Sequence, residues 1–230
     1  MSDLNELLPL MMKGTLVTIQ IAVFSILLAI IMACVATVVR AAPYRMLRWA
    51  GNAYVEIFRG TSLLVQLFWL FFVLPLPPFN LQLTPFTVAI VGLGLHYGAY
   101  GSEILRGALR SVPGGQYEAA LALNMPASAR LRRIVLPQAM IYALPPATNL
   151  MIELLKGTSL VSLITLSDLT FRARQLDEAT FKTAEIFALT LLIYFVLAQI
   201  IATVMRYFER RVSSHVAVRR AVPRAASWAH

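Results

Sequence analysis

The stretch QYEAALALNMPASARLRRIVLPQA, Gln116–Ala139, differs from the long apolar segments around it because it carries one glutamate and three arginines. Pro126 interrupts the stretch, so neither half is long enough to cross a bilayer. We therefore expect two short helices. Residues 116–123 form the first, with Glu118 at its positively polarised N-terminal end. Asn124 tolerates the left-handed conformation that ends a helix, and Pro126 suits the first turn of the next.

Both predicted helices are shorter than the length at which an isolated helix is stable in water. They must therefore pack against the rest of the chain or against a partner. Arg130, Arg132 and Arg133 make the second helix basic. Spacing alone favours a basic amphipathic loop that rests on anionic lipid headgroups over a docking site for another protein.

The composition is that of a membrane protein. Of the 230 residues, 59% are hydrophobic and only 13% are charged, where a soluble domain has about a quarter. The net charge of +9 resides in arginines between apolar runs, which fits orientation in a membrane better than nucleic-acid binding. Cys34 is the one cysteine, so no intrachain disulfide can form, and no Cys/His cluster indicates a metal site.

Five apolar stretches predict an all-α polytopic membrane helix bundle. A span of roughly 25 residues reaches about 37 Å, enough to cross a hydrocarbon core of about 30 Å with some tilt. The expected spans are Thr15–Val39, Ala53–Leu74, Pro85–Leu109, Val135–Leu155 and Ile186–Met205. Pro145 and Pro146 predict a kink in the fourth of them.

The charge of the connecting segments predicts the orientation. The first and third connections and the C-terminal segment are rich in arginine, whereas the second connection, LPLPPFNLQLT, has no charge. The positive-inside rule then places the N-terminus outside and the C-terminus in the cytoplasm. Residues 1–212 are expected to form a single transmembrane domain with a cytoplasmic loop at 112–137, and the basic tail at 213–230 is expected to be disordered.

The charged loop resembles the EAA loop of ABC importer permeases. That family pattern is EAA, three residues, Gly, nine residues and I-x-L-P, and Asn124 stands at the glycine position here. The resemblance implies that the loop is a coupling helix seated in a groove of a cytoplasmic ATPase. The residues that it assigns to this coupling are Glu118, Ala119, Ala120, Asn124, Arg130, Arg133, Ile134, Leu136 and Pro137.

Three other segments extend the resemblance over most of the chain. FRGTSLLVQL at 58–67 is similar to the FRGTP segment of polar amino-acid permeases, with Ser62 in place of proline. The segments 97–120 and 136–164 look like the same subfamily, with Gly157 where an aspartate is common. The chain is thus identified as resembling a permease subunit of a polar amino-acid ABC importer of the histidine/glutamine/opine type, with a type I importer fold.

The energy source is expected to lie in another chain. The phosphate cradle G-x-x-x-x-G-K-[ST] is absent, and LLKGTSL at 154–160 lacks its leading glycine and spacing. The resemblance implies a non-catalytic subunit in the bacterial cytoplasmic (inner) membrane. It further implies two ATP-binding subunits that hold ATP and Mg²⁺, a second permease chain, identical or paralogous, an extracytoplasmic binding protein and a polar amino-acid ligand. A stand-alone secondary transporter or channel is the alternative, although such carriers are often built from paired repeats that are not visible here.

Ionisable and polar groups within spans are candidates for function because burying them in lipid is costly. Arg59 lies three residues after Glu56, and an anchoring pair between them is slightly favoured over a substrate role. His96, Tyr100 and Glu103 share one helix face, either as satisfied bundle contacts or as a pathway lining.

A second candidate region lies where the fourth span ends. Glu153 is followed by Gly157, and a helix break there would expose backbone groups and the hydroxyls of Thr158 and Ser159 to an amino-acid ligand. The expected substrate-pathway residues are therefore Arg59, His96, Tyr100, Glu103, Glu153, Thr158 and Ser159.

Overall fold

The computed structural model describes the backbone of residues 2–220 and the side chains of residues 8–212. Every regular element within 2–220 is a helix, in agreement with the predicted all-α class. The α-helices are α1 (Ser2–Ala41), α2 (Arg45–Gly60), α3 (Leu63–Phe68), α4 (Pro85–Arg110), α5 (Gly114–Ala122), α6 (Ala127–Arg130), α7 (Leu136–Gly157), α8 (Leu169–Thr180) and α9 (Thr183–Arg220). Shorter π-helical and 3₁₀ segments extend three of them: η1 (Trp69–Val73), η2 (Leu131–Val135) and η3 (Thr158–Ile164).

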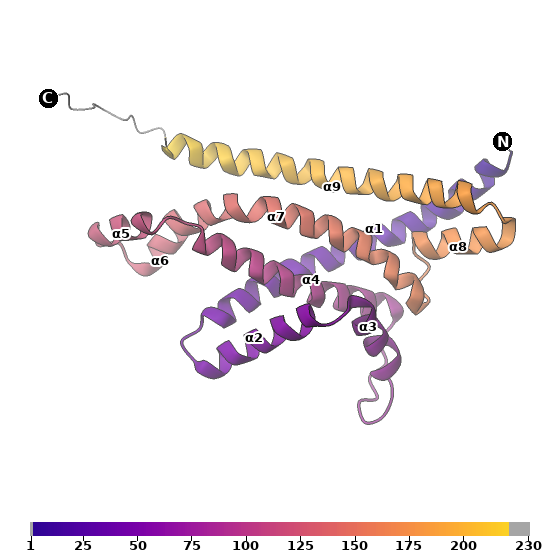
Figure 1. Cartoon of the computed structure of the whole chain (residues 1–230), viewed down its shortest axis with the longest axis horizontal. Coiled ribbons are helices and arrows are strands. Elements are labelled where there is room, and N and C mark those ends of the chain that lie inside the picture. Colours follow the sequence, from indigo (N-terminus) through magenta and orange to yellow (C-terminus); the bar gives the residue numbers. More distant parts are fainter. Residues whose placement is uncertain (1, 221–230) are drawn as a thin grey trace.

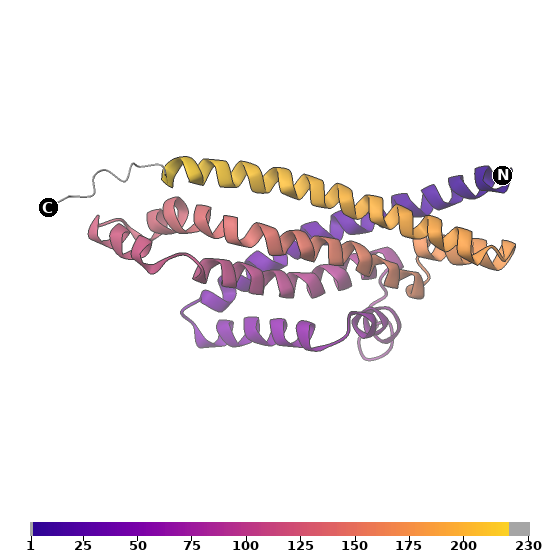
Figure 2. The same ribbon diagram turned by 45° about the horizontal axis from the view of Figure 1, so that its top comes forward.

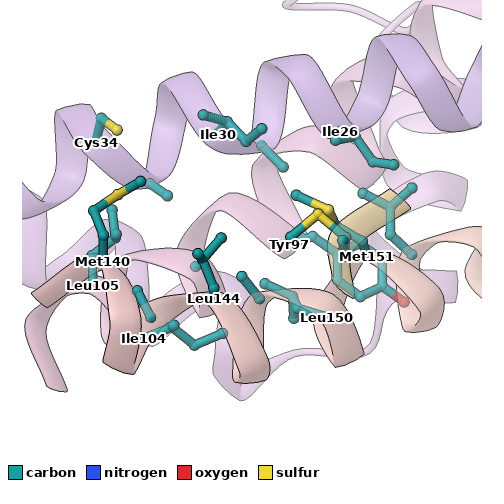
Figure 3. A pocket seen from close by; sticks show the side chains of 17 residues that line it. Ile26, Ile30, Cys34, Tyr97, Ile104, Leu105, Met140, Leu144, Leu150 and Met151 are labelled. Carbon is teal, nitrogen blue, oxygen red and sulfur yellow. The ribbon is translucent and has the colours of Figure 1, made fainter. Parts of the chain in front are cut away.

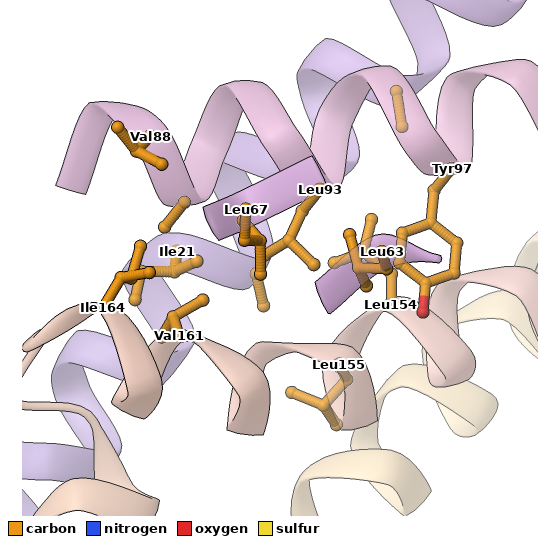
Figure 4. Packing of buried hydrophobic residues seen from close by; sticks show 13 residues of the cluster. Ile21, Leu63, Leu67, Val88, Leu93, Tyr97, Leu154, Leu155, Val161 and Ile164 are labelled. Atoms are coloured by element: carbon orange, nitrogen blue, oxygen red, sulfur yellow. The ribbon is translucent and has the colours of Figure 1, made fainter. Parts of the chain in front are cut away.

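The long helices α1, α4, α7 and α9 form an elongated bundle (Figure 1). Both views show α5 and α6 at the end of the bundle opposite to the start of α1, near the end of α9 (Figure 2). The central core joins α1, α3, α4 and α7 through side chains such as Ile21, Leu67, Leu93 and Leu154, which are almost fully buried (Figure 4). Glycine allows the close approach of α1 to α4, because a Cβ at Gly94 would lie 2.6 Å from Leu28 Cδ2.

The predicted count of five spans is not confirmed. Three helical stretches of the described chain are long and apolar enough to cross a membrane: Leu8–Ala41, Ala127–Ile164 and Thr183–Val212. A bent pair, α2 with α3 and η1, can supply a fourth. The expected third span does form a helix of 26 residues, α4. Its glycines and polar side chains lower its mean hydropathy, so it is not among the helices that are apolar enough to cross a membrane by composition.

The expected second span, Ala53–Leu74, is wrong as a single helix. The chain bends by 106° between Arg45–Gly60 and Leu63–Val73 because Thr61 and Ser62 are extended. The side chain of Gln66 bridges the bend: its Nε2 donates to the backbone Phe58 O at 3.0 Å and to the hydroxyl Oγ1 of Thr61 at 2.7 Å. The half-buried amide of Gln66 thus supplies a donor to Phe58 O, a backbone acceptor that the bend leaves without its helical partner.

The fourth and fifth predicted spans lie inside longer helices. Helical structure runs from Ala127 to Ile164 and passes through both Pro145 and Pro146. The helix α9 continues to Arg220, so the first eight residues of the tail expected to be disordered are helical. The remainder of that predicted tail lies outside the described residues.

The helix α8 was not anticipated from the sequence. Its apolar side chains Leu169, Ala173 and Leu176 pack against Met11 of α1 and Ile186 of α9. Asp168 begins the helix, because its carboxylate accepts hydrogen bonds from the backbone N–H groups of Thr170 and Phe171. The helix α8 therefore packs between the N-terminal part of α1 and the start of α9 and links the two.

Candidate functional site

The charged loop forms the predicted pair of short helices, which we call the coupling hairpin (residues 112–137). Asn124 ends the first helix in the left-handed conformation with φ 52°, as expected. Its N–H donates to Leu121 O at 2.8 Å, and the N–H of Met125 donates to Ala120 O at 3.1 Å. This is the hydrogen-bond pattern of a Schellman helix end, in which glycine is usual and asparagine is tolerated. The Gly-to-Asn difference from the family pattern therefore leaves the turn intact.

The coupling hairpin lies at one end of the bundle (Figure 1), and its exposed side chains are a mixture of apolar and charged groups. Glu118, Ala119 and Leu123 are exposed, whereas Ala120 is only 1% exposed and anchors α5. Among the other coupling residues, Arg133 and Leu136 are exposed and Arg130, Ile134 and Pro137 are half-buried. Short helices with exposed leucines and tyrosine, such as Leu121 and Tyr117, form a surface suited to a protein partner.

A cluster of four charged side chains connects α1, α2 and α4. Glu103 Oε1 lies 2.5 Å from Arg40 Nη1 and 3.9 Å from Arg59 Nη1, and its Oε2 lies 2.6 Å from Arg106 Nη2. Arg40 Nε also donates to Asn52 Oδ1 at 2.7 Å. Three guanidinium groups thus share one carboxylate. The expected anchoring pair of Arg59 with Glu56 is not the contact formed, since Arg59 turns toward Glu103 and Glu56 is exposed.

The predicted face of α4 continues this cluster toward the bend. His96 is buried and its Nδ1 lies 3.1 Å from Gln66 Oε1. Its ring centroid is 5.2 Å from that of Tyr100, and Arg59 Cζ lies 5.3 Å from the centroid of the same Tyr100 ring. Gln66 was missed in the sequence, where a single amide inside the apolar run LLVQLF was the available signal.

The second predicted region has a different structure from the one expected. The helix does not break at Gly157 but tightens into η3. Thr158 is fully buried and its hydroxyl donates to Leu155 O at 2.6 Å, while the Ser159 hydroxyl donates to Lys156 O at 2.8 Å. Both hydroxyls are therefore bonded to their own helix.

Gly157 has a packing role that explains the small residue. A Cβ at this position would lie 2.7 Å from the hydroxyl oxygen of Tyr97, which donates to Glu153 O at 3.0 Å. The side chain of Glu153 is exposed. Of the three residues predicted near the end of the fourth span, Glu153 alone directs a charged group outward.

The bundle also contains an apolar cavity of about 280 Å³ between α1, α4 and α7 (Figure 3). Ile30, Cys34, Ile104, Leu144 and Met151 are among the side chains that line it. Aliphatic and sulfur-containing groups supply no partner for a charged ammonium or carboxylate, so this cavity is unsuited to an amino-acid zwitterion. Within residues 8–212, no group of three or more His, Cys, Asp or Glu side chains is placed to hold a metal ion.

Comparison with known proteins agrees with this architecture. The family described as binding-protein-dependent transport system inner membrane component matches residues 25–214. The chain is 41% identical over 215 residues to the probable amino-acid ABC transporter permease protein y4tF of Sinorhizobium fredii, covering 92% of this chain and 90% of the relative. It is 36% identical over 210 residues to the L-cystine transport system permease protein TcyB of Bacillus subtilis, covering 91% and 89%.

Solved structures match over a similar extent. One chain of an amino acid ABC transporter crystallised with histidines has a TM-score of 0.84 and 29% identity, covering 91% of this chain and 97% of that chain. A chain of the MetNI methionine ABC transporter has a TM-score of 0.70 at 20% identity, a likeness that concerns the fold alone. The chain belongs to the binding-protein-dependent transport system inner membrane component family, the membrane-embedded, non-catalytic permease subunits of ABC transporters that work with ATPase and substrate-binding partners.

Proposed function

We propose that this permease moves a polar amino acid or an amino-acid derivative inward across the bacterial cytoplasmic membrane. Relatives that cover nine-tenths of the chain are described as amino-acid, L-cystine and arginine permeases, which supports this substrate class. The N-terminus lies outside and the coupling hairpin and C-terminus lie in the cytoplasm, in keeping with the arginine-rich connections.

The coupling hairpin is the observation that carries the proposal. Its Schellman turn at Asn124 holds α5 and α6 as a compact, exposed unit that is continuous with α7. A movement of the hairpin is therefore transmitted directly to a membrane-spanning helix. Two partner ATPase subunits bind and hydrolyse ATP with Mg²⁺, and their closure shifts this hairpin and a second permease chain, identical or paralogous, into an outward-open state. An extracytoplasmic binding protein then releases the ligand, and hydrolysis restores the inward-open state.

The polar groups along α2, α4 and α7 are proposed to line the path. Arg59 is 44% exposed in its side chain and lies beside Tyr100, so it can receive the carboxylate of a zwitterion. Glu153 is exposed on α7 and can receive the ammonium group. His96 and Glu103 act through their contacts to Gln66 and to the arginines. The hydroxyls of Thr158 and Ser159 donate to backbone carbonyls of their own helix, so these two residues stabilise η3 and do not bind the ligand directly.

The substitution Glu118→Lys tests the coupling role. Glu118 is exposed, so charge reversal is expected to leave the fold intact while lowering transport and ligand-stimulated ATPase activity of the assembled complex. The matched control is Glu178→Lys, which reverses an exposed glutamate on α8 at the other end of the bundle. Normal transport by Glu118→Lys in reconstituted vesicles would contradict the proposal, as would a wild-type permease that purifies without any ATPase.

A further inference from the structure

The coupling hairpin and the end of α4 line an open pocket of about 420 Å³. It lies between the end of α4 and the helices α5 and α6, and none of its lining residues belongs to the charged cluster at Glu103. The lining side chains that matter for its chemistry are Leu109, Arg110, Tyr117, Arg130, Leu131 and Val135. The volume is sufficient for a side chain from another protein.

The charge of this hairpin pocket is positive. Arg110 and Arg130 line it, and no aspartate or glutamate is among the lining residues. Arg130 Nε is buried and has no hydrogen-bond acceptor within the described residues. A buried N–H of a charged group without an acceptor is unfavourable, so the site gains free energy when an acceptor enters.

The arginine is held in place before any ligand arrives. Its guanidinium carbon lies 4.7 Å from the ring centroid of Tyr117, so α5 supports a group that belongs to α6. The Schellman turn at Asn124 fixes the orientation of α5 relative to α6. The π-helical turn η2 directly follows Arg130 and continues α6 toward α7. A guanidinium that is already oriented loses little conformational entropy when it binds a carboxylate.

We propose that the hairpin pocket receives an aspartate or glutamate side chain of the partner ATPase subunit, with Arg130 as its principal donor and Arg110 as a second positive charge. The walls made by Leu109, Leu131 and Val135 match the methylene stem of an acidic side chain. A free phosphate ion, polar on every side, would leave part of its surface against these walls without hydrogen bonds. The inference rests on the proposed function, since it names a contact of the same coupling hairpin.

The test measures association of the purified permease with its ATPase subunit in nanodiscs, with Kd determined at several salt concentrations. We expect Arg130→Gln to raise Kd at least about tenfold and to reduce its salt dependence, since a charge-assisted hydrogen bond is lost. Arg130→Lys keeps the positive charge but loses the planar guanidinium that stacks on Tyr117. Its Kd is therefore expected to lie between that of Arg130→Gln and that of wild type. The matched control Arg132→Gln removes an exposed arginine of the same hairpin that does not line the pocket, and it is expected to change Kd less than about threefold.

The outcomes separate the two proposals. If the wild-type permease does not bind the ATPase, the proposed function fails. If wild type binds and Arg130→Gln behaves like Arg132→Gln, the function stands and the pocket proposal is overturned. Arg110→Gln provides a second variant at an exposed position, so that a folding defect of Arg130→Gln does not block the test, and wild-type Kd for Arg110→Gln would also count against the pocket. Stabilisation of the isolated permease by inorganic phosphate that Arg130→Gln abolishes, with ATPase binding unchanged, would make this a free-anion site instead.

Discussion

Glu103 on α4 and Arg40 at the end of α1 approach within 2.5 Å, and the same carboxylate contacts Arg106 of its own helix and Arg59 of α2. Arg40 is the most enclosed of these arginines, with 12% of its side chain exposed. The helix α2 is amphipathic and packs only its Gly51 and Val55 side fully against the bundle. The shared carboxylate therefore helps to hold this helix in place.

We predict that Glu103→Gln destabilises the protein by roughly 2 kcal/mol, because Arg40 would remain enclosed without a carboxylate. Thermal or denaturant unfolding of the purified protein in detergent measures the effect. Glu56→Gln is the control, since Glu56 is exposed on α2, and its effect is expected to stay within about 0.5 kcal/mol. Equal stability of the two variants would show that the cluster does not hold the helices together.

Two glycines of α4 are predicted to respond oppositely to alanine. At Gly98 a Cβ would lie 2.7 Å from Met32 Cβ and 3.2 Å from Ala29 O, so Gly98→Ala is expected to cost about 1–3 kcal/mol of unfolding free energy by overpacking. At Gly107 a Cβ would meet nothing within 4 Å, so Gly107→Ala is expected to stabilise the helix by about 0.5–1 kcal/mol. The same unfolding measurement on both variants decides whether α1 and α4 approach as closely as described.

The turn of the coupling hairpin depends on a left-handed residue. Asn124→Gly is expected to preserve ATPase-coupled transport, because glycine adopts φ near 52° without a steric penalty. Asn124→Val is expected to disfavour the turn by roughly 1–2 kcal/mol and to reduce coupled transport, because a β-branched side chain is strained there. Transport assays on vesicles containing equal amounts of each variant provide the comparison. A fully active Asn124→Val protein would mean that the turn geometry is unimportant for coupling.

The buried cap of α8 makes stability depend on pH. Burial raises the pKa of Asp168 from 3.8 to about 6, although the backbone N–H groups of Phe171 and Thr170 favour its charged form. Between these values the folded state holds a proton that the unfolded state has released. This contribution is therefore present at low pH, is lost as pH rises toward 6, and amounts to at most about 3 kcal/mol.

The variant Asp168→Asn isolates the pH-dependent contribution of Asp168 to the free energy of unfolding. Asparagine also caps a helix and does not titrate, so the stability of wild type relative to the variant is expected to fall as pH rises from about 4 to 6 and to be constant above it. Unfolding midpoints of both proteins across this range give the difference. A difference that grows with pH instead would show that Asp168 is stabilised in its charged form.

Much of the candidate site could be anticipated from local patterns. Glu118, Asn124 and Pro126 predicted two short helices with a left-handed residue between them, because helix ends depend on the residues next to them. The shared face of His96, Tyr100 and Glu103 followed from helical periodicity. The partner of Arg59 could not be found in this way, since spacing indicated Glu56 on the same helix whereas the contact made is with Glu103 on another helix.

The bend at Thr61 and the continuous helix at Gly157 were misjudged for a related reason. An apolar run long enough to span a membrane, 53–74, is naturally interpreted as one helix. The amide of Gln66 indicates the bend only once the structure shows that it donates to Phe58 O and Thr61 Oγ1 across the bend. At Gly157 the sequence suggests a break, but the glycine is there because the hydroxyl of Tyr97 packs against it.

The sequence by itself determined the membrane class, the all-helical architecture and the form of the coupling hairpin, since these follow from hydropathy, periodicity and helix-end chemistry acting over a few residues. Only the tertiary structure decided which arginines share Glu103, where the second apolar run bends, and that the guanidinium of Arg130 stacks on the ring of Tyr117 in a pocket. Those arrangements depend on contacts between residues tens of positions apart, or across a turn, and local propensities carry no information about such pairings.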